Sequence, residues 1–427
     1  MTEQLAIWSS RRPWLTLAGW ALALVAAIAI SAAFLGSALS ADEEVTSDTE
    51  SRRADELRSE RFAGERERGF TEVVVMRSST ATVDHPRFER RVRALAVELR
   101  RAGATQVATV HDSGERRLVS ADRDATGMPV ALGPDAEDDI ETVVDAVRRA
   151  DGRDGFDVSI TGEFTLDADL STLAEEDLRD GELGFGLPAA LIVLLIVFGS
   201  VVAGVIPLLL AIVSIVVALA LLALVGQAFP LSVFATNMLT GMGLALGIDY
   251  SLFGLSRYRE ERLHGRERLG AIAAVGATAS RAVMFSGIAF TLAMVGLLLV
   301  PTTVMRSVAA GAIVAALVSV AAALTLLPAL LSLLGDRVDA LRIPFVGRTA
   351  SREQSPLWSR TVQAAMRRPL ISLGLATAVL LAMAAPVLAL RSGEAGVSTL
   401  PDRVPAKQGY QALNAEFPAR PPSRRRS

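Results

Sequence analysis

The sequence predicts an α-helical, multi-pass membrane bundle of seven spans, with an α+β domain inserted after the first span. Hydrophobic residues make up 51% of the 427 positions, and the mean hydropathy is +0.40. Long apolar runs alternate with segments that are dense in Arg, Asp and Glu. Residues 183–250 contain one carboxylate, Asp249, in a run far longer than the ~20 residues that cross a bilayer as a helix.

The first span is expected at residues 14–35, directly after Arg11, Arg12 and Pro13. The small residues at 37–41 would suit cleavage of a secretory signal peptide, which remains the alternative. A signal peptide has an apolar core of only ~7–15 residues, however, and this run is longer. Its length therefore favours a retained membrane anchor.

Residues 41–180 are polar and highly charged, and their pattern predicts an α+β domain. The expected strands are 70–76, 106–110, 116–120 (extended by 129–132) and 156–161, and the expected helices are 85–101 and 135–150. This β-α-β-β-α-β order is that of the split ferredoxin-like motif. We expect the acidic face of the second helix (Glu137, Asp138, Asp139, Glu141) to be solvated rather than a metal site.

Six further spans follow the domain, at 183–198, 201–225, 231–255, 282–300, 303–334 and 370–390. The arginines before the first span place the N-terminus in the cytoplasm, because basic residues collect in cytoplasmic loops. The loops after the fourth and sixth spans are also rich in arginine, and alternate counting places both of them inside. We therefore expect residues 37–182 to be extracytoplasmic and the protein to lie in the cell membrane.

These boundaries divide the chain into six parts. They are 1–36, the cytoplasmic N-terminus and first span; 37–182, the extracytoplasmic domain; 183–334, spans two to six; 335–369, a cytoplasmic Arg-rich loop; 370–391, the seventh span; and 392–427, a further extracytoplasmic segment. The last segment ends in a low-complexity tail without the pattern of a packed core.

Composition excludes several classes of function. The formal net charge of −3 argues against a nucleic-acid partner. The chain has no cysteine for iron–sulfur or Cys-based zinc sites, and its three histidines are far apart in the sequence. Because no nucleophile elbow, Walker A loop or H-E-x-x-H motif occurs, we expect neither an enzyme nor a bound cofactor or metal.

Asp249 needs an explanation because it lies inside the fourth span. An acidic side chain at the middle of a membrane costs ~2.5–3.5 kcal/mol on insertion scales. Desolvation disfavours the charged form of a carboxyl group, so such a group can take up and release protons as its access changes. Tyr250, about 100° further round the helix, can bond a second partner or a water. A static buried ion pair or a hydrogen bond between helices is the alternative.

Small residues surround this acid. Gly243 and Gly247 form a G-x-x-x-G step, and Gly254 continues the same face, so we expect tight helix packing here. In the next span, Ser286 lies about one turn beyond Arg281, where it can reach water near a proton path. Bonding of Ser286 to its own helix is equally open.

Three runs resemble those of a known family. The run 247–253 (Gly-Ile-Asp-Tyr-Ser-Leu-Phe), followed by Arg-Tyr-Arg-Glu-Glu at 257–261, resembles the fourth-helix signature of the MMPL (mycobacterial membrane protein large) family. Residues 283–287 resemble its fifth helix, and the similarity extends over residues 11–418. This family belongs to the resistance–nodulation–division superfamily. The resemblance implies proton-driven export of lipids or other hydrophobic molecules, with membrane lipids, the lipid substrate and protons as partners.

Residue by residue, the resemblance makes Asp249 a proton carrier, Tyr250 its partner and Ser286 a neighbouring polar member of the relay. It makes 37–182 a porter domain and 392–427 the start of a second one. Family members carry a second Asp-Tyr pair on the tenth helix, which this sequence lacks, so the chain resembles an N-terminal half. We expect a truncated chain that needs its second half. A half-transporter that assembles with a partner chain, or a non-transporting scaffold or lipid/sterol-sensing-like protein, is the alternative.

Overall fold

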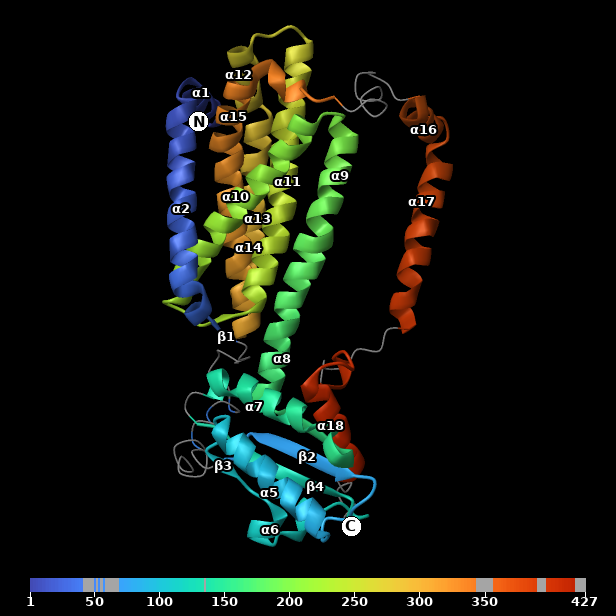
Figure 1. Cartoon of the computed structure of the whole chain (residues 1–427). Helices are drawn as coiled ribbons and strands as arrows, with labels where there is room; N and C mark the ends of the chain where they lie inside the picture. The colour runs from blue at the N-terminus through green and yellow to red at the C-terminus, as the bar shows by residue number, and fades with distance from the viewer. Residues whose placement is uncertain are drawn as a thin grey trace. The chain divides into compact units, whose positions relative to one another are not determined.

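The computed structural model divides the chain into two compact units. It describes residues 1–40, 69–133, 136–342, 356–389 and 397–418, together with residues 50, 53 and 57. The helical unit comprises Met1–Thr46 and Glu176–Gly393, and the α+β unit comprises Ser47–Glu175 and Glu394–Ser427. Figure 1 shows the elements of both units.

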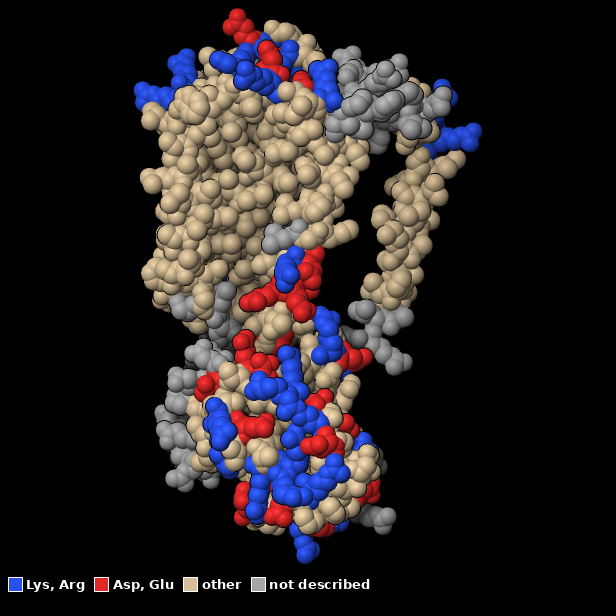
Figure 2. All heavy atoms as spheres, in the orientation of Figure 1, with Lys and Arg blue, Asp and Glu red and all other residues tan. Residues whose placement is uncertain are grey.

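Seven helices among the described residues are long and apolar enough to cross a membrane. They are built on α2 (Pro13–Ala38), α9 (Leu187–Phe198), α10 (Val201–Gly226), α11 (Phe234–Leu263), α13 (Ala279–Leu297), α14 (Thr303–Ala321) and α17 (Pro369–Ala384). Figure 2 shows charged side chains at one end of the helical unit and a broad middle band almost without them. The prediction of a multi-pass helical membrane protein is confirmed.

Shorter elements extend or connect these spans. They are α1 (Thr2–Arg11), η3 (Asp177–Gly186), α12 (Arg268–Ala277), η4 (Ala322–Leu326), α15 (Leu327–Leu334), η5 (Gly335–Asp339), α16 (Pro356–Arg367), η6 (Ala385–Ala389), and the paired strands β1 (Leu39–Ser40) and β6 (Leu231–Ser232). The helix α11 continues to Leu263, beyond the membrane span predicted at 231–255. Ion pairs of Arg257 with Glu260 (2.7 Å) and Glu261 (2.5 Å) support these last, polar turns.

Small side chains bring α10, α11 and α14 together at the centre of the helical unit. Ala211, Ala309 and Ala312 are fully buried there. At Gly311 a side-chain carbon would lie 2.5 Å from the carbonyl oxygen of Ala235, so only glycine allows α14 to approach α11 this closely. The helix α11 is thereby held by its neighbours, which determines the direction of its remaining side chains.

The α+β unit contains an antiparallel four-stranded sheet with the order β3-β4-β2-β5. Its strands are β2 (Glu72–Ser78), β3 (Gln106–Val107), β4 (Ala125–Ala131) and β5 (Phe156–Gly162). The cross-strand neighbours Val74, Met128 and Ile160 are buried with the apolar faces of α5 (Pro86–Arg101) and α7 (Ala136–Ala150). Both helices therefore contribute to one core with the sheet.

The first part of the predicted third strand was wrong, whereas most of its predicted extension, 129–132, lies in the strand. The strand lies at 125–131, whereas the predicted segment 116–120 forms the 3-10 turn η1 (Arg116–Leu118) and one isolated bridge from Val119 to Thr126. The threonine hydroxyl donates to the carbonyl of Leu118 at 2.8 Å, which holds this turn beside the true strand. A short helix, α6 (Val110–Ser113), and a 3-10 turn, η2 (Arg153–Gly155), complete the connections.

Two further helices, α8 (Glu163–Glu176) and α18 (Pro405–Glu416), belong to the α+β unit, and a 3-10 turn, η7 (Val397–Thr399), precedes the second. The Asp169 carboxylate of α8 accepts a hydrogen bond from the Ala406 amide at 2.7 Å. At the other end of α18, Glu416 pairs with Arg77 of β2 at 3.3 Å. Residues 397–418, which the sequence assigned to the start of a second domain, thus pack together with 69–175 in one unit.

Candidate functional site

Asp249 lies on a side of α11 that is exposed in the described part of the chain. Ala245, Phe253 and Ser256 share this exposed stripe, as their spacing of three and four residues requires. A helix face in a membrane protein meets either lipid or further protein, and lipid is a poor environment for a carboxylate. The chemistry of Asp249 therefore depends on what covers this stripe.

Tyr250 has the opposite environment from its neighbour. Its side chain is 5% exposed and packs with Val283 of α13 and Ala323 of η4. Its hydroxyl has no hydrogen-bond partner in the described part of the chain. A side-chain carbon at Gly287 would lie 3.7 Å from this hydroxyl and would overlap the Val320 side chain, so the glycine allows α13 to pack closely against α14 beside the tyrosine. A buried hydroxyl without a partner among the described residues suits binding of a water or passage of a proton.

Ser286 stands next to Gly287 on α13 and is exposed. Within the residues that the structure describes, no hydrogen bond joins Ser286 to Asp249 or Tyr250. The surrounding surface of α13 is apolar, with Phe285 55% exposed. The structure thus places the three relay candidates on adjacent helices, while only the tyrosine hydroxyl is enclosed.

Three of the four glycines of α11, namely Gly243, Gly247 and Gly254, lie against neighbouring helices. A side-chain carbon would lie 2.7 Å from Ile215 at Gly243 and 2.6 Å from the Ala211 Cα at Gly247, both on α10. At Gly254 it would lie 2.5 Å from Leu327 of α15. Because Asp249 is roughly 200° round the helix from the second of these glycines, the glycine face and the acid face are nearly opposite.

Sequence reasoning missed one carboxylate near this helix. Glu182 of η3 lies beside α11, because a side-chain carbon at Gly241 would lie 3.1 Å from its Oε1 atom. The signal in the sequence was an acidic residue directly before an apolar run, on a segment rich in glycine. Its contact with α11 depends on the wide, π-helical turn of η3, which the local pattern does not predict.

Charged residues fix the polar end of α11. Glu261 is 5% exposed and lies between Arg257 at 2.5 Å and Arg266 at 3.0 Å. Arg259 pairs with Asp339 at 2.8 Å. A buried carboxylate with two guanidinium partners is well compensated, so this end of the helix resists rotation.

The chain is similar to a known family of membrane proteins and to several of its members. The family model described as MMPL family matches residues 45–372. The Streptomyces coelicolor membrane protein SCO6666 is 34% identical over 427 residues, which cover 98% of this chain and 58% of that protein. Two Mycolicibacterium smegmatis proteins are also similar. The mycolic acid-containing lipids exporter MmpL11 is 39% identical over 53% of this chain, and the trehalose monomycolate exporter MmpL3 is 29% identical over 62%. The matches span 58% or less of these relatives' lengths.

Proposed function

The chain belongs to the MMPL family, and on that premise we propose that it takes part in proton-driven export of lipids or other hydrophobic molecules across the cell membrane. Two relatives named as lipid exporters support the substrate class. The observation that carries the proposal is that Asp249, on the exposed stripe of α11, directly precedes Tyr250, whose buried hydroxyl has no partner among the described residues. The protein acts here as a transporter rather than an enzyme.

The physical basis is the energy of a carboxylate in a membrane. The charged form is disfavoured there by several kcal/mol unless it is compensated, and protonation removes that penalty. A change in access from one side of the membrane to the other then converts a proton gradient into a change of conformation. The Tyr250 hydroxyl can hold a water or pass a proton, and Ser286 adds a polar group on the neighbouring helix.

Further protein completes the site in this proposal. The stripe around Asp249 and most of the α13 surface are uncovered, and the apolar helix α17 has no buried residue. Either a longer form of this chain or a partner chain covers these faces, and it supplies the polar groups that compensate the carboxylate. This agrees with the limited share of the relatives' lengths that the chain spans.

The α+β unit is, in this proposal, a ferredoxin-like porter domain outside the cytoplasm. The element order and the sheet order β3-β4-β2-β5 support this fold, because they correspond to those of the split β-α-β motif. The arginine-rich ends of the spans support a cytoplasmic N-terminus and an extracytoplasmic position for residues 37–182. A domain at this place would receive the exported molecule or guide it away from the membrane.

The test is proton movement in proteoliposomes that carry the full chain. With an imposed pH gradient and an internal pH-sensitive dye, Asp249→Asn should abolish gradient-driven proton uptake. The matched control is Asp180→Asn, which changes an acid whose side chain is 82% exposed and should leave uptake unchanged. Measurable uptake that is equal in all three proteins would contradict proton coupling. It would favour the alternative of a scaffold or lipid-sensing protein.

A second readout does not depend on transport. Hydrophobic carbodiimides react with protonated carboxyl groups in apolar surroundings, and mass spectrometry locates the adduct. We expect labelling at Asp249 and no labelling at the exposed Asp180. Labelling of Asp249 without proton uptake would indicate a half-transporter that needs its partner.

A further inference from the structure

The arginines of the α+β unit fall into two groups. Some tie α5 to the end of α7: Arg91 donates to the Ala150 carbonyl and Arg87 to the Asp154 carbonyl, each at 3.0 Å. The side chains of others, among them Arg149 and Arg153, form no hydrogen bond or ion pair with any residue that the structure describes. Figure 2 shows Lys and Arg side chains gathered over this unit, with carboxylates between them. The unpaired arginines are therefore available for a ligand.

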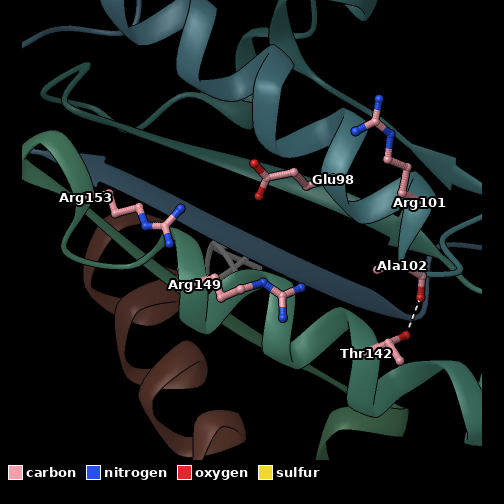
Figure 3. Close-up of a pocket in the computed structure, with 6 residues that line it drawn as sticks. All are labelled: Glu98, Arg101, Ala102, Thr142, Arg149 and Arg153. Atoms are coloured by element: carbon pink, nitrogen blue, oxygen red, sulfur yellow. Dashed lines mark hydrogen bonds between the residues drawn. The ribbon is translucent and has the colours of Figure 1, made fainter.

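These unpaired arginines line a groove between α5 and α7. The groove has a volume of about 370 Å³ and is lined by Glu98, Arg101, Ala102, Thr142, Arg149 and Arg153. Figure 3 shows Arg149 and Arg153 on one side and Glu98 on the other, all directed into the space, while Arg101 is turned away from it. The Thr142 hydroxyl donates to the Ala102 carbonyl at 2.5 Å and closes one end.

The bonds of Arg87 and Arg91 to backbone carbonyls join α5 to the segment at the end of α7. Together with the Thr142 bond they support the separation of the two helices, so the groove does not need to form when a ligand arrives. Pre-formed sites bind with a smaller loss of conformational entropy. The groove is open to solvent on one side, and its volume leaves room for a group larger than one small ion.

We propose that this groove binds a phosphate group carried by a larger headgroup, with Arg149 and Arg153 as its ligands. The two guanidinium groups come from positions four residues apart and lie on the same side of the groove. A carboxylate has two oxygens in one plane, which a single guanidinium can bond fully, whereas a tetrahedral phosphate can bond two guanidinium groups at once. The remaining volume accommodates the group attached to the phosphate.

Glu98 gives the site its selectivity. Its carboxylate faces the two guanidinium groups from α5 but forms no ion pair with them among the described residues. It repels a small free anion and can accept hydrogen bonds from the hydroxyl groups of a headgroup. The groove therefore disfavours inorganic phosphate relative to a phosphate that carries hydroxyl groups.

Binding to the full chain in phosphatidylcholine nanodiscs, measured by calorimetry, tests the proposal. The probes are inorganic phosphate, glycerol 3-phosphate, and liposomes of phosphatidylcholine with and without phosphatidylglycerol as competitors. Arg149→Gln with Arg153→Gln should weaken glycerol 3-phosphate binding at least tenfold. Arg116→Gln with Arg117→Gln, which removes the same charge from the exposed turn η1, should leave it unchanged. Competition by phosphatidylglycerol identifies a lipid source, and its absence identifies a soluble one.

Glu98→Gln provides a test in which binding should become stronger. A variant that failed to fold would bind more weakly, so misfolding cannot produce this result. Glu98→Gln should strengthen the binding of inorganic phosphate several-fold and weaken the preference for glycerol 3-phosphate. Equal binding by the groove variant and the η1 variant would overturn the proposal, as would unchanged phosphate binding in Glu98→Gln. None of these results depends on proton uptake, so the proposed transport function and this site can fail separately.

Discussion

Glu72 of β2 is fully buried and accepts hydrogen bonds at the start of α8. The donors are the Phe164 amide at 2.9 Å, the Thr165 amide at 3.3 Å and the Thr165 hydroxyl. Burial raises the pKa of Glu72 from 4.5 to about 7, although the hydrogen bonds from Thr165 and Phe164 oppose this shift. The carboxyl group is therefore neutral in the folded unit under mildly acidic conditions.

The raised pKa makes the α+β unit less stable as the pH rises. Between 4.5 and about 7, the unfolded chain releases the proton of Glu72 while the folded chain keeps it. The contribution of Glu72 to the free energy of unfolding is complete below pH 4.5 and is lost by about pH 7. The difference between the pKa of Glu72 in the folded chain and its ordinary value corresponds to about 3 kcal/mol, at about 1.36 kcal/mol per pKa unit. Glu72→Gln, which does not ionise, should remove this part of the pH dependence.

Hydrogen exchange of the full chain in nanodiscs measures this effect, after correction for the intrinsic rates at each pH. In the unaltered protein, the opening free energy of β2 and the first turn of α8 should fall by about 3 kcal/mol between pH 4.5 and pH 8. In Glu72→Gln it should be nearly constant. Glu89→Gln, on the surface of α5, is the matched control and should retain the fall. The same fall in Glu72→Gln would refute the reasoning.

Two further predictions concern α11. Gly247→Val should lower stability by about 1–3 kcal/mol, because the new side chain meets Ala211 of α10. Gly296→Val, at a position with nothing within 4 Å, should change it little, and thermal unfolding in detergent compares the two. Tyr250→Phe removes a hydroxyl that has no partner among the described residues, so the melting temperature should stay the same or rise. Proton uptake should nevertheless fall, and unchanged uptake would exclude the hydroxyl from the relay.

The spans were predictable because hydropathy acts locally. A run such as 201–226 leaves no choice other than a membrane helix. The third strand of the α+β unit was partly misplaced because 116–120 and 125–131 are both short and partly apolar. Which one joins the sheet depends on pairing with Val74 and Val75, distant in the sequence. Local pattern cannot decide between two such candidates.

The candidate site was predictable only in part. Asp249 was identified from the sequence because it is the one acid in its apolar run. The burial of Tyr250 could not be inferred, since it depends on side chains of α13 and η4. Glu72 gave no signal either, because a single Glu at the start of a β-rich run is normally exposed. Its partners lie more than ninety positions later in the chain.

The glycine face and Asp249 act together, because both belong to one helix. Contact of Gly243 and Gly247 with α10 fixes the rotation of α11 about its axis, and this rotation directs Asp249 to the uncovered side. A rotation by one residue, about 100°, would turn the carboxylate toward α10, whose sequence contains no charged residue. A buried carboxylate without a counter-charge is disfavoured by several kcal/mol. Larger residues at 243 or 247 should therefore impair proton uptake as well as packing, even though neither glycine takes part in proton transfer.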